Sequence, residues 1–328
     1  MKDGRAFAVG TFAQEHFRGK TNISLSKLKL AVPKILTALW AIKERLNLAS
    51  EFSASIGFLL PAGECVEGDI KELEQMLLPE LSSFTTPSGK MRVSLVKDLT
   101  VKPEGAGVLL YHQKKNTKKS GKNSSIGFLG IGYRNSNMLI WKNGGISAKD
   151  RHTSDLGFDY LLSEASSHIG SALTHSQLNE ILILSGWNVE REKFDRYLKS
   201  IGESNRSESI ASGIKKAKKM YMHYLEEWLS SIGVDRVETV VTFGGAAEFL
   251  KVPLTQYCES NSVTDICWHG EVKIPKKVLD KIVADQDEGG LDFRMIDPWC
   301  YLHILNGKIE GYEKHGYAKL LKENKNAE

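Results

Sequence analysis

The sequence predicts a two-lobed α/β protein, and three observations lead to this expectation. Strand-like and helix-like segments are mixed in both halves of the 328-residue chain, which is typical of sheets covered by helices. Each half also contains strands that run into glycine turns. A polar stretch rich in lysine, residues 114–122, lies between the halves and indicates a boundary. We therefore expect a first lobe over residues 1–118, a second lobe over 119–310 and a tail over 311–328.

The composition is that of an ordinary globular protein, with 41% hydrophobic and 26% charged residues. A net charge of +4 is too small to indicate a nucleic-acid or membrane partner unless the charge is clustered. No segment reaches the roughly 18 uninterrupted apolar residues of a membrane helix, and no signal peptide is recognised. The four cysteines form no Cys-x-x-Cys pair, so no zinc-ligand set is expected. These features predict a cytoplasmic protein without a membrane partner.

The first half is expected to begin with a short strand over residues 5–9. A long amphipathic helix follows over residues 26–46, with apolar residues at helical spacing, and Pro33 is expected to kink or restart it. The other elements expected here are, in order, a strand over 53–60, a helix over 68–81, strands over 91–95 and 99–101, and a helix ending at residue 110.

The second half is expected to open with two strands, 126–131 and 136–141, that form a hairpin. A second turn is predicted at Asn143-Gly144-Gly145. The chain is then mainly helical, and its clearest helix is expected over 214–232. The remaining elements are a buried strand over 237–242 and a helix over 246–250.

The hairpin turn is the first candidate for chemistry, because a strand ends in glycines there and returns as a second strand. Glycine lets backbone N–H groups approach a phosphate closely, and such a turn forms an anion-binding concavity. Gly130 and Gly132 supply the glycines, and Asn135 and Ser136 are candidate donors. The alternative is an ordinary hairpin with a glycine turn.

A second candidate is the junction at which an apolar strand meets Gly244 and Gly245 and enters a helix. Small residues let a flat ring or a sugar lie against the backbone, and a helix N-terminus favours an anion. The alternative is a tight strand-to-helix connection without a ligand.

Glu104 is the third candidate, because it follows a predicted strand and precedes a predicted helix. A carboxylate in that position could orient a water for attack on a phosphoryl group. The alternative is a solvent-facing glutamate that caps the helix.

Two lysine-rich stretches, 114–122 and 215–219, are interpreted as solvated surface. No aromatic residues are interleaved with the first, so direct DNA binding is not expected. The buried face beside the second is expected to consist of the following six residues: Met220, Tyr221, Tyr224, Leu225, Trp228 and Leu229.

Taken in order, several segments resemble the ParM/StbA family of actin-like plasmid-segregation proteins, and most closely its cyanobacterial plasmid variants. The resemblance covers roughly Arg5 to Leu305. The segments that carry it are Arg5–Gly10, Ser26-Lys27, Gly57–Pro61, Pro103-Glu104, Gly130–Ser136, Ser154–Phe158, Thr242–Ala246, and Arg294 with Asp297.

The resemblance implies an actin-like (ribonuclease H-like) two-lobed fold that binds ATP and Mg²⁺ in a nucleotide cleft. It also implies head-to-tail, nucleotide-dependent filaments for plasmid partition, with a DNA-binding adaptor protein as partner. Glu104 would position the attacking water. The nucleotide-binding positions implied are Gly130, Gly132, Asn135, Ser136, Gly157, Gly244 and Gly245.

Two departures from the family pattern reduce the expected ATPase activity. No segment matches the Asp-x-Gly strand and first phosphate loop, so the first lobe is expected to be N-terminally incomplete. Gly130 stands where the family has an aspartate that helps to hold Mg²⁺, and a divalent ion needs such oxygen ligands. The alternatives are a non-hydrolysing interaction module and a sugar-kinase-like phosphotransferase, although no carboxylate base beside a sugar pocket can be placed.

Overall fold

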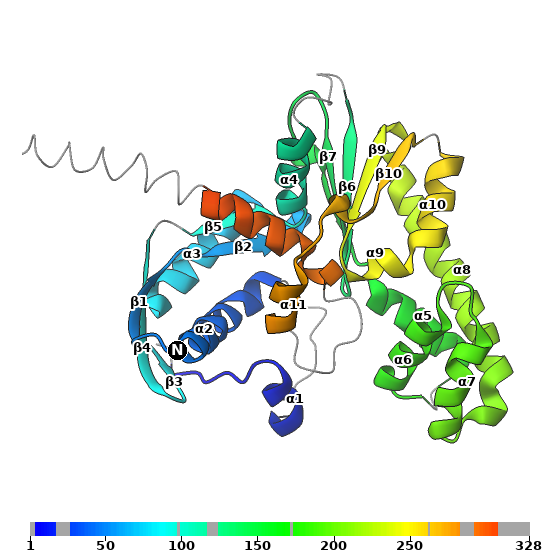
Figure 1. The fold of residues 1–328 in the computed structure, drawn as a ribbon, viewed down its shortest axis with the longest axis horizontal. Coiled ribbons are helices and arrows are strands. Elements are labelled where there is room, and N and C mark those ends of the chain that lie inside the picture. Colours follow the sequence, from blue (N-terminus) through cyan, green and yellow to red (C-terminus); the bar gives the residue numbers. More distant parts are fainter. Residues whose placement is uncertain are drawn as a thin grey trace, which may run out of the picture. The chain divides into compact units, whose positions relative to one another are not determined.

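The computed structural model describes residues 4–17, 27–96, 99–116, 124–170, 173–261, 263–282 and 292–307 (Figure 1). Internal contacts divide the chain into unit 1, Met1–Glu104, and unit 2, Gly105–Glu328. The division therefore falls before helix α4 (Ala106–Asn116), which the sequence had placed in the first lobe. The physical reason is that the N-terminus of α4 is bound by Asp297, a residue of unit 2.

Unit 1 is built from helices and short strands, and the strands form two small sheets. One sheet has the strand order β1-β4-β3, and the other pairs β2 with β5 in parallel. Strand β1 is parallel to β4, whereas β3 and β4 form an antiparallel hairpin. The elements are α1 (Thr11–Phe17), α2 (Lys27–Leu46), β1 (Glu51–Ala54), β2 (Gly57–Leu60), α3 (Glu67–Leu81), β3 (Phe84–Thr86), β4 (Gly89–Leu95) and β5 (Thr100–Pro103).

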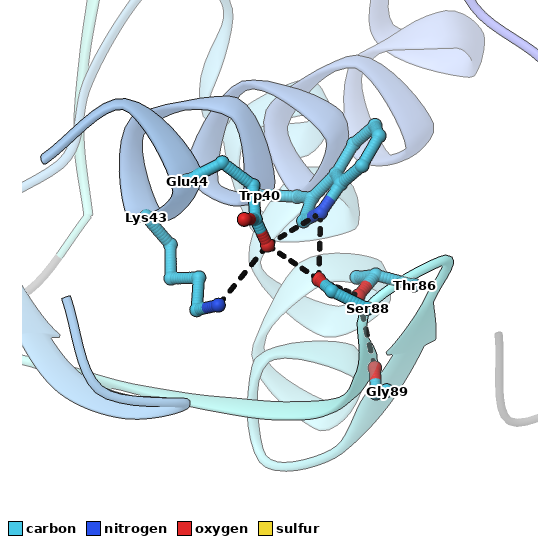
Figure 2. A network of polar contacts seen from close by, with 6 residues as sticks. All are labelled: Trp40, Lys43, Glu44, Thr86, Ser88 and Gly89. Atoms are coloured by element: carbon cyan, nitrogen blue, oxygen red, sulfur yellow. Dashed lines mark hydrogen bonds and ion pairs between the residues drawn. The ribbon is translucent and has the colours of Figure 1, made fainter. Parts of the chain in front are cut away.

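Helices α2 and α3 supply most of the core of unit 1. Leu60, Leu73 and Leu77 are completely buried, and each buried leucine side chain stabilises the fold by roughly 2 kcal/mol. A polar network joins the last turns of α2 to the β3–β4 hairpin (Figure 2). Within it, Ser88 Oγ donates to Glu44 Oε1 at 2.5 Å, and this bond lowers the pKa of Glu44. The network fixes the hairpin against the helix at the surface of the unit.

Several sequence expectations for unit 1 are confirmed and two are wrong. Helices α2 and α3 begin and end within one residue of their predicted limits, and α2 continues through Pro33. Residues 5–9 form no strand, because no described strand pairs with them. The single strand expected over 53–60 is two strands in different sheets.

Unit 2 contains one larger sheet surrounded by helices (Figure 1). Its elements are α4, β6 (Ile126–Ile131), β7 (Ser136–Trp141), β8 (Arg151–Ser154), α5 (Phe158–Ile169), α6 (His175–Ser185), α7 (Arg191–Ser200), α8 (Ser207–Ser231), β9 (Thr239–Phe243), α9 (Gly245–Phe249), α10 (Lys251–Ser260), β10 (Asp265–Cys267), α11 (Lys276–Ile282) and a helix over 292–307.

The strand order of this sheet is β10-β9-β6-β7-β8. Strands β6, β7 and β8 are antiparallel neighbours, whereas β9 and β10 run parallel to β6. The predicted hairpin is confirmed with its expected limits. All residues of β6 are buried, as expected for a central strand with both faces covered.

The two lysine-rich stretches differ from expectation. Residues 114–116 belong to α4, whereas 117–122 lie outside the described residues. In the second stretch, the side chain of Lys218 is buried although the other lysines are exposed, so the interpretation as solvated surface is wrong there. Met220 is exposed and does not join the buried face. Among the described residues, no helix combines the length and apolar character required to cross a membrane.

Candidate functional site

The two glycine turns singled out in the sequence lie side by side in unit 2. Strands β6 and β9 are adjacent and parallel, and Gly130 is aligned with Phe243, so both strands end at the same edge of the sheet. The hairpin turn Gly132–Asn135 follows β6, and Gly244 and Gly245 follow β9. Ligands of α/β sheets bind outside the carboxyl ends of such strands. This edge is therefore the candidate site.

Gly244 holds the two turns in contact. Its φ of +95° is favourable only for glycine, and a Cβ there would lie 2.5 Å from the carbonyl oxygen of Ile131. The end of β9 thus approaches the end of β6 more closely than any residue with a side chain would permit. A substitution at Gly244 must separate the turns.

The hairpin turn is fixed by the start of α5. Phe158 N donates to Gly132 O at 3.0 Å, and Asp159 N donates to Tyr133 O at 2.8 Å. A Cβ on Gly157 would lie 2.3 Å from the carbonyl carbon of Arg134. Gly157 therefore allows α5 to pack on the turn, and the first amides of the helix bind the turn itself.

The side chains expected to donate from this turn point into the protein. Ser136 is completely buried, and its Oγ donates to Leu156 O at 2.7 Å. Asn135 is also buried, and its Oδ1 accepts from Asn137 Nδ2 at 3.5 Å. Gly132, by contrast, has room for a Cβ, because the nearest atom would be Asn135 O at 3.4 Å. Gly132 N donates to Asn135 O at 3.0 Å within the hairpin, so a ligand that approaches Gly132 would have to replace this bond.

Arg294 and Asp297, on the helix over 292–307, have separate surroundings. The aliphatic part of the Arg294 side chain lies against the Gly244-Gly245 turn, since a Cβ on Gly245 would be 2.8 Å from Cγ of Arg294. Its side chain is exposed, which leaves a positive charge beside this turn. Asp297 is buried and caps α4, accepting from Gly105 N at 2.7 Å and Val108 N at 3.1 Å.

The ring of Phe243 fills the space over Gly130. A Cβ at residue 130 would lie 2.4 Å from two ring carbons, so the structure has no room there for an aspartate. The described residues also contain no group of three or more acidic, histidine or cysteine side chains that could hold a metal. Residue 130 therefore cannot supply a carboxylate oxygen to Mg²⁺ in this structure.

Glu104 is the last residue of unit 1. Its backbone N donates to Leu60 O at 2.6 Å, and its carboxylate forms an ion pair with Lys27 Nζ. The side chain is only 17% exposed. In this structure the carboxylate is therefore engaged within unit 1.

The sequence did not reveal a histidine at the same edge of the unit 2 sheet. His269 follows β10, its N donates to Thr242 Oγ1 at 3.3 Å, and its Nε2 lies 2.9 Å from Glu248 Oε2. Its ring stacks on Phe293 at 4.2 Å, and its backbone has a φ of +55°. Burial raises the pKa of Glu248, but the bond to His269 and the nearby charges outweigh burial and lower it. Without a predicted strand at 265–267, no sequence signal placed His269 at this edge.

Comparison with solved structures identifies the fold. No protein-family model matches the sequence, and no curated protein matches it either. The archaeal actin homologue Ta0583 superposes with a TM-score of 0.53 and 16% identity, covering 85% of this chain and 75% of that one. Its complex with ADP gives 0.50 and 18%, covering 80% and 75%. ParM of Bacillus thuringiensis with ATP gives 0.51 and 14%, covering 90% and 80%. The chain therefore has an actin-like fold, as expected from the sequence.

Proposed function

We propose that this protein is an actin-like nucleotide-binding protein of the ParM/StbA type. The observation that carries the proposal is the pair of glycine turns at the carboxyl ends of β6 and β9, held in contact at Gly244. Two of the solved proteins that share the fold contain ADP or ATP. The nucleotide would bind at this edge of the unit 2 sheet.

The backbone at Gly132 would contact the phosphates, which requires its N–H to exchange the bond to Asn135 O at 3.0 Å for one to a phosphate oxygen. The turn Gly244-Gly245 would face the nucleoside, with the Arg294 guanidinium close enough to Gly245 to neutralise negative charge. A phosphate contact from Ser136 would require its bond to Leu156 O to break. Main-chain groups and one arginine are thus the main recognition elements of the proposed site.

Turnover of the bound nucleotide is proposed to be weak. Glu104 is the residue proposed to position the water, but its carboxylate is paired with Lys27. Residue 130 also cannot supply a carboxylate to Mg²⁺, because Phe243 fills the space at Gly130. These two observations favour a second candidate function, a non-hydrolysing actin-like module that binds nucleotide and a protein partner.

Self-association into nucleotide-dependent filaments is part of the proposal. It is supported by the actin-like fold and by the order of the family segments along the chain. Plasmid partition in the cytoplasm, with a DNA-binding adaptor protein, is proposed on the resemblance to the ParM/StbA family. Light scattering of the purified protein with ATP, with ADP and without nucleotide tests assembly, and scattering that stays monomeric in all three would contradict it.

Calorimetric titration with ADP and with ATP tests the nucleotide site directly. We expect micromolar binding, about −8 kcal/mol, and at least a tenfold loss in Gly244→Ala, because a Cβ there pushes the turns apart. Gly144→Ala is the matched control. Gly144 has a similar φ of +82°, but no atom lies within 4 Å of its Cβ position. The affinity of Gly144→Ala for ADP and ATP should therefore equal that of the wild type. No binding by the folded wild type, or equal affinity in both variants, would refute the site.

A further inference from the structure

Lys218 of α8 is a buried lysine whose ammonium group has no carboxylate partner among the described residues. Its Nζ donates to Ser185 Oγ at 3.2 Å, to Gly186 O, and to Trp187 O at 3.3 Å. The same nitrogen lies 5.7 Å from the ring centre of Trp187 and 5.1 Å from that of Phe249. Both distances are within the range of cation–π attraction. The ammonium is thus enclosed by carbonyl and hydroxyl oxygens and two aromatic rings.

The turn that supplies these oxygens has a strained backbone. It connects α6 to α7 and contains Val189, a β-branched residue with a φ of +56°. Such a conformation is costly for valine and persists only where the surroundings impose it. The bonds from Lys218 to the first residues of this turn are among those surroundings.

Aromatic contacts connect this cage to both glycine turns of the proposed site. The Phe249 ring lies 5.9 Å from Trp187 and 5.3 Å from Phe158, edge to face in both cases. Phe249 is the last residue of α9, the helix that starts at Gly245. Phe158 is the first residue of α5, and its N donates to Gly132 O. Phe249 therefore contacts or belongs to the elements that adjoin both glycine turns.

We infer that Lys218 is a positioning residue for the nucleotide site, and that its protonation state regulates nucleotide affinity through Phe249. The inference rests on the proposed function for its ligand. With its proton, Lys218 attracts the two rings and binds the 185–187 turn through charged hydrogen bonds. Without it, the cation–π attraction is lost and α9 is held less firmly. Affinity is therefore highest when Lys218 is charged.

No described carboxylate faces Lys218 from the elements packed around it. Glu248 of α9 binds His269 and Lys251, and Glu190, which follows the strained turn, pairs with Lys193. On α8 itself, the neighbouring lysines Lys215, Lys216 and Lys219 are exposed. Burial alone lowers the pKa of Lys218, to about 7. The change in charge therefore falls near neutral pH.

Affinity for ADP measured from pH 6 to pH 9 tests the inference, with each wild-type value divided by that of Lys218→Arg. Arginine keeps its charge throughout, so the ratio cancels the titration of ADP itself. We expect wild-type affinity to fall about fivefold relative to Lys218→Arg as the pH rises, the size of one cation–π contact. Lys218→Met should match the high-pH wild type at every pH. A ratio that stays flat while ADP binds would overturn the inference and leave the proposed function standing.

Hydrogen exchange without nucleotide separates this inference from the proposed function. If the wild type binds no ADP at any pH, the proposed function fails, but the exchange rates of the α9 amides still show whether the contacts of Lys218 stabilise this helix. Exchange in α9 that increases above neutral pH in wild type relative to Lys218→Arg would support control of α9 by Lys218. Equal exchange in the two proteins across the range would overturn it.

Discussion

Burial of Lys218 predicts a pH-dependent stability of unit 2 that Lys218→Met removes. The pKa of an unfolded lysine is 10.5, and burial lowers that of Lys218 to about 7. Each pH unit of difference corresponds to ~1.4 kcal/mol, so the full effect is ~5 kcal/mol. The side chain is only 3% exposed, which supports a contribution of this order.

The sign of the effect follows from proton binding. Between pH 7 and pH 10.5 the unfolded chain holds the lysine proton more often than the folded chain does. The free energy of unfolding of the wild type therefore rises with pH in this window, and the gain is lost as the pH falls to about 7. From pH 7 to pH 9.5 the wild type should gain about 3 kcal/mol relative to Lys218→Met.

Urea unfolding at several pH values, followed by tryptophan fluorescence, measures this difference. Trp40 is the one tryptophan of unit 1, so a Trp40→Phe background makes the signal specific to unit 2. Lys219→Met is the matched control, because Lys219 is exposed and should show no slope against wild type. If the difference between wild type and Lys218→Met stayed constant with pH, the ammonium would be reaching water and the reasoning would be refuted.

Two further predictions concern contacts at the edge of the candidate site. Gly130→Ala should destabilise unit 2 by about 1–3 kcal/mol through overpacking against Phe243. Phe243→Leu should relieve part of this cost, so the effects of the two changes on the free energy of unfolding in urea should not be additive. Additive effects would contradict the contact. Asp297→Asn should cost about 1–3 kcal/mol, because Gly105 N and Val108 N bind different carboxylate oxygens and an amide places an NH₂ group at one of the two positions. Hydrogen exchange should also rise in the first turn of α4. Unchanged exchange there would show that Asp297 does not hold the helix.

Features set by neighbouring residues were predictable from the sequence. The β6–β7 hairpin follows from two apolar runs around a short turn, and α2 follows from apolar residues at helical spacing. The glycine turns after β6 and β9 were located because glycines directly follow each of these apolar runs. Their contact through Gly244 and Ile131 depends on the parallel pairing of strands that are distant in sequence.

Features set by distant residues were not predictable. Lys218 belongs to a run of lysines that reads as a solvated face, and only the 185–187 turn and Phe249 show why it is buried. Residues 5–9 have strand-like composition, but a strand requires a pairing partner, which no local pattern reveals. The hydroxyl of Ser136 is a reasonable phosphate donor in the sequence, yet the fold directs it to Leu156.

The packing of Phe243 on Gly130 also bears on the order in which substitutions could accumulate in a lineage. A side chain introduced first at residue 130 meets the ring at 2.4 Å, whereas a smaller residue introduced first at 243 leaves a cavity. Removing the ring costs about 3–5 kcal/mol until a second change fills the space. A carboxylate at residue 130 therefore requires a change at residue 243 as well, whichever comes first. The glycine and the phenylalanine would be inherited as a pair.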